Sequence, residues 1–182
     1  MRITIIPPVV TEVNTTKIFL PDVEATERFG GCLAAAVQAE SADIAECGLN
    51  VRLEGNLGAG KTATARAFLR ALGVSGRIKS PTFTLLETYP LANGLEAFHF
   101  DFYRFESPEE FLDAGFRENF APKHITLVEW SEKALPCLPP DDLTLTLTVH
   151  DDGRDLEIAP HSPLGQKVFD EVLRAWNSHA DR

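Results

Sequence analysis

The stretch "LNVRLEGNLGAGKTATARAFLRALG", residues 49–73, decides the fold. It opens with a short β-prone run, passes through a glycine-rich loop and continues into a segment rich in helix formers. The loop matches the pattern G-x-x-x-x-G-K-[ST], in which Gly55 and Gly60 are the two glycines and Lys61 and Thr62 complete the motif. Strand, loop and helix therefore stand in the order that a phosphate-binding loop needs.

The loop residues suit the phosphates of a nucleotide and their metal ion. Glycines, Gly58 among them, let successive backbone N–H groups converge on an anion, and the helix that follows adds its positive end. Lys61 would reach the terminal phosphates, and the hydroxyl of Thr62 would bind magnesium. The sequence therefore predicts a nucleotide site and not merely a structural glycine turn.

Two acidic residues outside the loop are candidates for the same site. Glu129 follows the apolar run "ITLV", at the carboxyl end of an expected buried strand, where an acid that serves magnesium is normally found. Asp101 lies in "FHFDFYRF" and would share one strand face with His99, away from the phenylalanines. An acid in this setting costs stability unless it is paired or hydrogen-bonded. Two interpretations stay open for Asp101: an ion pair with Arg104 or another base, and an acid that orients water.

The first half of the chain alternates expected strands and helices. "KIFL" predicts a short strand, and Asp22 can cap the alanine-rich helix that follows, although Gly30 and Gly31 weaken that helix. "TFTLLETYP" and "LEAFHFDFYRF" are β-prone runs on either side of a turn, which suggests a hairpin. "SPEEFLDAGF" has a capping-box pattern and predicts a short helix.

The second half predicts a further hairpin and a final helix. "DDLTLTLTVH" alternates strictly, so one face of a half-buried strand is expected to carry Leu143, Leu145, Leu147 and Val149. "DDGRDLEIA" supplies a turn and a return strand. "SPLGQKVFDEVLRAWNS" predicts a helix whose apolar stripe, with Trp176 near its end, could pack on the sheet or on a partner.

These elements predict an α/β fold of the P-loop NTPase-like, three-layer kind, with a mixed parallel and antiparallel sheet. The expected organisation is an amino-terminal extension over residues 1–15, an ATPase domain over 16–160, and a carboxyl-terminal helix over 161–182 that belongs to the same domain.

Composition narrows the class of protein. The 182 residues have the length of about one domain, and the net charge of −10 provides no broad cationic field to recruit nucleic acid. The three cysteines form neither a disulfide framework nor a zinc pattern. No signal-peptide pattern occurs, and no run of apolar residues reaches the length of about 18 that a membrane span needs. We expect a soluble cytoplasmic protein without a membrane partner.

ATP is the expected nucleotide, because no N-K-x-D segment of the kind that reads guanine in Ras-like GTPases follows the loop. A small-molecule kinase stays open as an alternative, although only Arg104, Arg117 and Arg154 lie between Thr82 and the final helix, too few for an arginine-rich lid. A nucleotide-sensing binding module is the third possibility. The segment "KSPTFT", residues 79–84, weakly suggests a loop that senses the terminal phosphate.

Four segments together resemble the bacterial TsaE-type ATPases: "GNLGAGKT", "KSPTFTLLETY", "FHFDFYRF" with the following "EEFLDAGF", and "LVEW". They occur in the order and spacing of that family, and the resemblance extends from about Leu20 to Ile158. It implies a small P-loop domain that binds ATP with magnesium and hydrolyses it slowly unless assembled with partners.

The resemblance also implies a role in the modification of tRNA. The family takes part in making threonylcarbamoyladenosine on tRNA, beside the anticodon. The implied partners are two related proteins, one catalytic and one scaffold-like, that transfer the threonylcarbamoyl group, so tRNA would be met only indirectly. ATP hydrolysis would reset the complex between turnovers.

By position, the resemblance implies roles for individual residues. Thr62 and Glu129 match the magnesium ligands, Asp101 matches an acid required for hydrolysis, and Lys61 completes the catalytic set with Asp101 and Glu129. Residues 22–26 and Arg154 match positions at which proteins of the family approach the adenine. The implied nucleotide contacts are Gly55, Leu57, Gly58, Ala59, Gly60, Lys61, Thr62, Trp130 and Arg154. Asn56 departs from the family, which commonly has an acid there; little effect is expected, because the loop works through backbone N–H groups.

Overall fold

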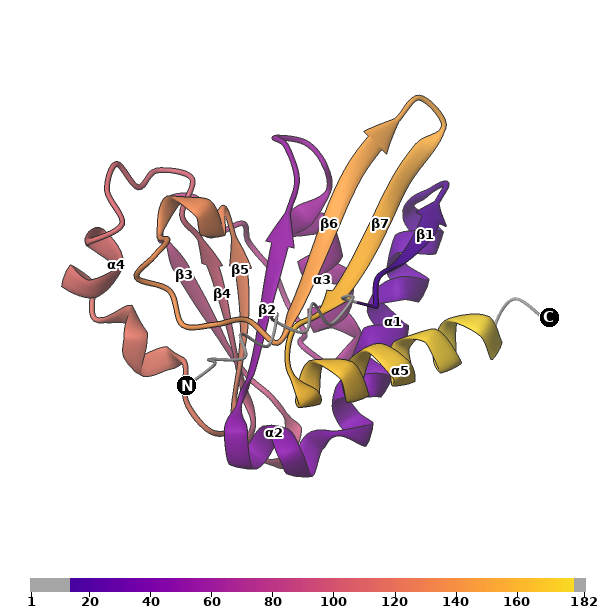
Figure 1. Ribbon diagram of the computed structural model, residues 1–182, viewed down its shortest axis with the longest axis horizontal. Helices are drawn as coiled ribbons and strands as arrows, with labels where there is room; N and C mark the ends of the chain where they lie inside the picture. The colour runs from indigo at the N-terminus through magenta and orange to yellow at the C-terminus, as the bar shows by residue number, and fades with distance from the viewer. Residues whose placement is uncertain (1–13, 179–182) are drawn as a thin grey trace, which may run out of the picture.

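The computed structural model describes residues 14–178, which build one seven-stranded mixed sheet (Figure 1). The spatial order of the strands is β1-β7-β6-β2-β5-β4-β3. Their bounds are β1 Thr16–Leu20, β2 Leu49–Glu54, β3 Leu86–Pro90, β4 Glu96–Asp101, β5 His124–Glu129, β6 Leu143–His150 and β7 Gly153–Pro160.

The parallel part of this sheet positions the loop. β2 lies between β5 and β6 and is parallel to both, and β4 runs parallel to β5. The carboxyl ends of these strands therefore share one edge, which is where open α/β sheets bind their ligands. The pairs β1–β7, β6–β7 and β3–β4 are antiparallel, so the expected α/β fold with a mixed sheet is confirmed.

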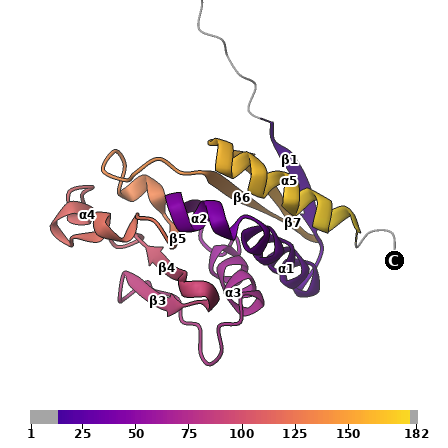
Figure 2. The same ribbon diagram turned by 90° about the horizontal axis from the view of Figure 1, so that it is seen from below.

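Helices cover both faces of the sheet. α1 and α3 pack against each other on one face, while α4 and neighbouring short turns lie on the other side of β4 and β5 (Figure 2). α5 follows β7 and packs against α1. The helices span α1 Val23–Ala39, α2 Ser41–Cys47, α3 Lys61–Ala71, α4 Glu110–Asp113 and α5 Pro163–Ser178, with short 3₁₀ turns η1 Ala92–Gly94, η2 Phe116–Asn119 and η3 Ser131–Lys133.

α1 is continuous through the glycines that were expected to weaken it. Asp22 caps it, because its carboxylate accepts a hydrogen bond of 2.7 Å from the backbone N–H of Ala25. A side chain at position 30 would stand 2.5 Å from the backbone of Ala67 in α3. Gly30 thus lets α1 and α3 approach closely, and this packing compensates for its low helix propensity.

The core has two parts, one on each side of the sheet. The larger part contains Phe29 of α1, Phe68 of α3 and apolar residues of every central strand. The smaller part is an aromatic cluster that includes Phe98 and Phe100 of β4 and Phe111 of α4. Because successive residues of a strand point to opposite faces, β4 contributes to both parts.

Both expected hairpins form, with shorter or less buried strands than the sequence predicts. β3 begins only at Leu86, since residues 81–84 form turns, and β4 ends at Asp101. Leu143, Leu145 and Leu147 are buried as expected, but Val149 is 57% exposed. Val149 lies near the tip of the β6–β7 hairpin, which projects past the neighbouring strand (Figure 1), so alternation alone misplaced it.

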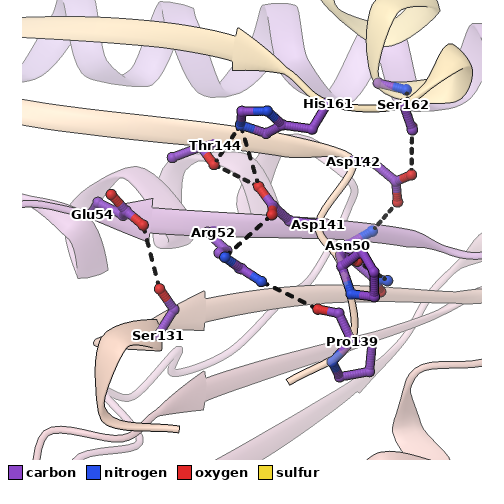
Figure 3. A network of polar contacts seen from close by, with 12 residues as sticks. Asn50, Arg52, Glu54, Ser131, Pro139, Asp141, Asp142, Thr144, His161 and Ser162 are labelled. Atoms are coloured by element: carbon purple, nitrogen blue, oxygen red, sulfur yellow. Dashed lines mark hydrogen bonds and ion pairs between the residues drawn. The ribbon is translucent and has the colours of Figure 1, made fainter. Parts of the chain in front are cut away.

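A polar network holds the start of β2, on the side of the sheet opposite the carboxyl ends of the parallel strands (Figure 3). The Arg52 guanidinium lies 3.3 Å from Asp141 and donates to the Pro139 carbonyl. Asp142 accepts from the backbone N–H of Asn50 at 2.7 Å and from the hydroxyl of Ser162 at 2.6 Å. These contacts join the start of β2 to the segments that begin β6 and α5.

The final helix packs within the chain: Trp176 of α5 contacts Phe29 of α1, with ring centroids 6.4 Å apart. The expected extension at residues 1–15 lies outside the described residues except for its last two positions. Across residues 14–178, no helix combines the length and the apolar character that crossing a membrane requires.

Candidate functional site

A cavity of about 320 Å³ opens at the carboxyl ends of β2, β5 and β4. It is lined by the glycine-rich loop, the start of α3 and the ends of two strands. The lining residues are Leu57, Gly58, Ala59, Gly60, Lys61, Thr62, Ala63, Ser80, Thr82, Asp101, Tyr103, Glu129 and Trp130. Residues from four separate segments of the chain thus meet in one cavity.

The loop places Lys61 at the centre of the site. Its ammonium group donates to the carbonyls of Gly55 and Asn56, the latter at 3.0 Å, and lies 4.1 Å from the ring centroid of Trp130. Gly60 adopts a φ of +103°, and the guanidinium of Arg154 occupies the space that a side chain there would need. Any other residue at position 60 would have a strained backbone and would have to displace Arg154. The exposed Asn56 contributes its backbone carbonyl to these bonds.

The charge environment of Lys61 is mixed. The residue is 5% exposed, and burial lowers the pKa of its ammonium group below the usual value. The carboxylates of Glu129, Glu132 and Asp101 oppose this change. The carboxylates thus favour the charged form of Lys61, and an ammonium group forms strong, charge-assisted hydrogen bonds with phosphate oxygens.

Glu129 is held by two side chains. The hydroxyl of Thr62 lies 2.8 Å and 3.0 Å from the two carboxylate oxygens, so it can donate to either. On its other side, Nε2 of His99 lies 2.8 Å from Oε1 of Glu129. Glu129 and His99 are both almost fully buried, at 2% and 0% exposure.

Asp101 is satisfied by hydrogen bonds and not by an ion pair. The hydroxyl of Thr82 donates to Oδ2 at 2.8 Å, and the backbone N–H of Tyr103 donates to Oδ1 at 2.9 Å. Among the described residues no ion pair joins Asp101 to Arg104, whose guanidinium lies 4.1 Å from the ring centroid of Phe83. The interpretation of Asp101 as the partner of Arg104 is therefore wrong.

A second cavity, of about 480 Å³, adjoins the first between α1 and α3. Its lining includes Val23 and Thr26 of α1 and Arg154 of β7, and it shares Ala63 with the first cavity. Arg154 also donates to the Ala59 carbonyl at 3.2 Å, so it connects the β6–β7 hairpin to the loop.

The structure brings nearly all the expected site residues together. Gly55 contributes through its carbonyl, Arg154 lies at the border of the two cavities, and the other expected residues line the first cavity. His99 was missed as a site residue, because lone histidines are more often structural. The available signal was its place on the same strand face as Asp101, two residues earlier.

The oxygen atoms of Thr62 and Glu129 fit a magnesium ion by their chemistry, because Mg²⁺ prefers oxygen ligands. Among residues 14–178, no group of three or more His, Cys, Asp or Glu side chains could hold a metal ion by itself. This is consistent with Mg²⁺ sites that use one or two protein ligands and take the remainder from substrate phosphates and water.

Comparison with known proteins identifies one family. The family model described as "Threonylcarbamoyl adenosine biosynthesis protein TsaE" matches residues 20–156. The chain is 38% identical to the tRNA threonylcarbamoyladenosine biosynthesis protein TsaE of Haemophilus influenzae, over 83% of this chain and 93% of the relative. Its identity to the Bacillus subtilis protein of the same name is 35%, over 78% and 89%. The crystal structure of Bacillus subtilis YdiB is similar, with a TM-score of 0.66 and 26% identity over 89% of this chain and 96% of that one.

Proposed function

The chain belongs to the TsaE family of threonylcarbamoyl adenosine biosynthesis proteins, and from this premise we propose that it is a magnesium-dependent ATPase. Its hydrolysis of ATP supports the protein complex that installs threonylcarbamoyladenosine on tRNA beside the anticodon. The observation that carries the proposal is the convergence of Lys61, Thr62, Asp101 and Glu129 on one cavity.

Nucleotide binding rests on the loop and the start of α3. The backbone N–H groups from Leu57 to Thr62 bind the phosphates, helped by the positive end of α3. Lys61 exchanges its bonds to the carbonyls of Gly55 and Asn56 for phosphate oxygens. Thr62 and Glu129 hold the magnesium ion, which supplies charge neutralisation on the phosphates when it is bound.

Hydrolysis requires an oriented water molecule, and Asp101 is placed for this task. Its two oxygens are already held by Thr82 and by the backbone of Tyr103, so the carboxylate has a fixed orientation at the wall of the cavity. A carboxylate held in this way can accept a hydrogen bond from water and direct it toward the terminal phosphate.

The base of the nucleotide extends from the loop into the second cavity. Val23 and Thr26 offer a partly apolar wall, and Arg154 stands between this wall and the loop. A cavity of about 480 Å³ is within the range of small-ligand pockets.

Partners provide the link to tRNA. With a net charge of −10, the chain would be repelled by a polyanion, so contact with tRNA runs through the catalytic and scaffold-like proteins of the complex. The protein works in the cytoplasm, where these partners and tRNA are found. Turnover is slow for the isolated chain and rises when the complex assembles.

The test is ATP turnover by the purified chain with and without the two partner proteins, measured beside the formation of modified tRNA. We expect slow release of inorganic phosphate alone, acceleration by the partners, and loss of modification when magnesium is chelated. Full turnover without partners, unchanged by their addition, would sink the proposal. Transfer of the phosphate to a nucleoside or small alcohol would favour the kinase, and ATP binding without hydrolysis in the assembled complex would favour a binding module.

A further inference from the structure

His99 is a fully buried polar side chain beside the site, and the roles proposed above do not use it. It is 0% exposed, in β4, and its Nε2 lies 2.8 Å from Oε1 of Glu129. Its Nδ1 has no hydrogen-bond partner among the described residues. A buried polar atom without a partner costs about 1–3 kcal/mol, so packing alone would favour an apolar residue here.

The neighbours of His99 make its polarity more notable. The preceding residue on the same face of β4 is Ala97, and the residue beside His99 on β5 is Leu127, both fully or almost fully buried. On the other side, the residue beside His99 on β3 is Glu87, which is partly exposed and accepts a hydrogen bond from Thr84. The Glu129 carboxylate is the group that the imidazole contacts by a hydrogen bond. The ring is therefore oriented by, and in turn orients, that carboxylate.

The hydrogen bonds also fix the form of the ring. Glu129 accepts from Thr62, which is consistent with an ionised carboxylate, and Nε2 must then carry the proton that it donates to Oε1. With Nδ1 unprotonated, the buried atom without a partner is an acceptor. A doubly protonated ring would instead bury an N–H donor without an acceptor, which is rarer in proteins.

We propose that His99 is a positioning residue, which holds the Glu129 carboxylate in place for the magnesium ion; this inference rests on the proposed function. Glu129 has two side-chain hydrogen bonds, from Thr62 and from His99. If Thr62 and Glu129 were both to hold the metal ion, the hydroxyl of Thr62 would be shared between the ion and the carboxylate. The bond from His99 would then be the side-chain contact that serves the orientation of Glu129 alone.

The two partners of Glu129 differ in their access to the cavity. Thr62, at the start of α3, lines the cavity, whereas the fully buried His99 is not among the lining residues. Hydrogen bonds of this type, from a histidine to a metal-binding carboxylate, fix the orientation of the ligand, and their loss commonly lowers metal affinity or activity by about 10–100-fold.

Two variants of the full chain test this role. In His99→Gln the side-chain amide nitrogen replaces Nε2 and can still reach Glu129, whereas in the shorter His99→Asn it stands nearer the place of Nδ1 and cannot. We expect His99→Asn to raise the magnesium concentration for half-maximal binding of a fluorescent ATP analogue by about tenfold or more, and His99→Gln by less than about threefold. Binding of the analogue in EDTA should be the same in wild type and both variants.

Equal magnesium dependence in the two variants would overturn the proposal, as would wild-type behaviour of His99→Asn. Nitrogen NMR of the nucleotide-free wild type gives an independent readout that needs no variant to fold. The proton is expected on Nε2; a ring protonated on Nδ1 alone would refute the pairing. If the wild type shows no magnesium-dependent nucleotide binding, the proposed function fails, and the NMR result still decides whether His99 holds Glu129.

Discussion

The two faces of β4 present opposite solutions to the same problem, the burial of five consecutive residues. One face carries Phe98 and Phe100, which pack into an aromatic cluster with α4 and its neighbouring turns. The other face carries His99 and Asp101, whose polar atoms bond to Glu129 and Thr82. All four residues are at most 5% exposed. Apolar burial stabilises the fold on one side, and hydrogen bonds on the other hold polar groups beside a cavity.

The largest effect is expected on the aromatic face. Phe100 is fully buried, and its ring contacts those of Phe102, Phe116 and Phe120 at centroid distances of 5.2–5.6 Å. Phe100→Ala should lower the free energy of unfolding by about 3–5 kcal/mol, measured by urea denaturation. The folded fraction should keep its affinity for ATP, and Phe100→Leu is the milder control. A large loss of ATP affinity without loss of stability would mean that the aromatic face serves the site and not the stability of the fold.

On the polar face, Asp101→Ala should act on catalysis. We expect turnover in the assembled complex to fall by about 100-fold or more, because the group that orients water is lost. Affinity for ATP should change by much less, and the melting temperature should stay close to that of the wild type. The measurement is turnover beside equilibrium binding. A fall in ATP affinity as large as the fall in turnover would contradict the assigned role.

Lys61→Ala should act in the reverse way, mainly on the affinity for ATP. In the proposed site the ammonium group bonds to phosphate, and a hydrogen bond to a charged group contributes about 1.5–3 kcal/mol, which corresponds to a loss of roughly 10–100-fold in ATP affinity. Binding of a fluorescent nucleotide reports this loss, with Lys167→Ala on the exposed surface of α5 as the matched control. Unchanged binding in Lys61→Ala would mean that the loop does not hold the phosphates.

The smallest effect is expected for Thr82→Val, which keeps the shape of the side chain and removes the hydroxyl that bonds to Asp101. The loss of one such bond corresponds to about 1 kcal/mol, so turnover should fall by roughly fivefold. Ser80→Ala removes the hydroxyl that lies 2.8 Å from the hydroxyl of Thr82, and it should have less effect. An effect of Thr82→Val as large as that of Asp101→Ala would mean that Thr82 itself contacts the reacting groups.

The sequence predicts the fold well because its signals are local. The glycine-rich loop, the capping residue Asp22 and the alternation from Leu143 to Leu147 each depend on neighbours in the chain. Its failures involve distant contacts. Gly30 allows the close approach of Ala67 on α3, and Val149 is exposed because the hairpin extends beyond its neighbour strand.

The residues of the candidate site also divide into those with local sequence signals and those that depend on distant contacts. That Lys61, Thr62 and Glu129 lie at one cavity could be predicted from the motif and from the place of Glu129 after a buried strand, because these signals depend on position along the chain. The partner of Asp101 could not be identified, since Thr82 is 19 residues away and competes with the sequence neighbour Arg104. His99 was missed for the same reason, because its partner lies 30 residues later on an adjacent strand.

Trp130 gives the protein an optical probe at the place where the chemistry is expected. The chain has two tryptophans, and their indoles lie in different surroundings: the ring of Trp130 faces the ammonium of Lys61 at 4.1 Å, and that of Trp176 faces the guanidinium of Arg28 at 4.0 Å, between α1 and α5. The tryptophan emission of a Trp176→Phe chain would therefore come from Trp130 alone, directly after β5. Its fluorescence would record the departure of Lys61 from the indole in real time, without any label.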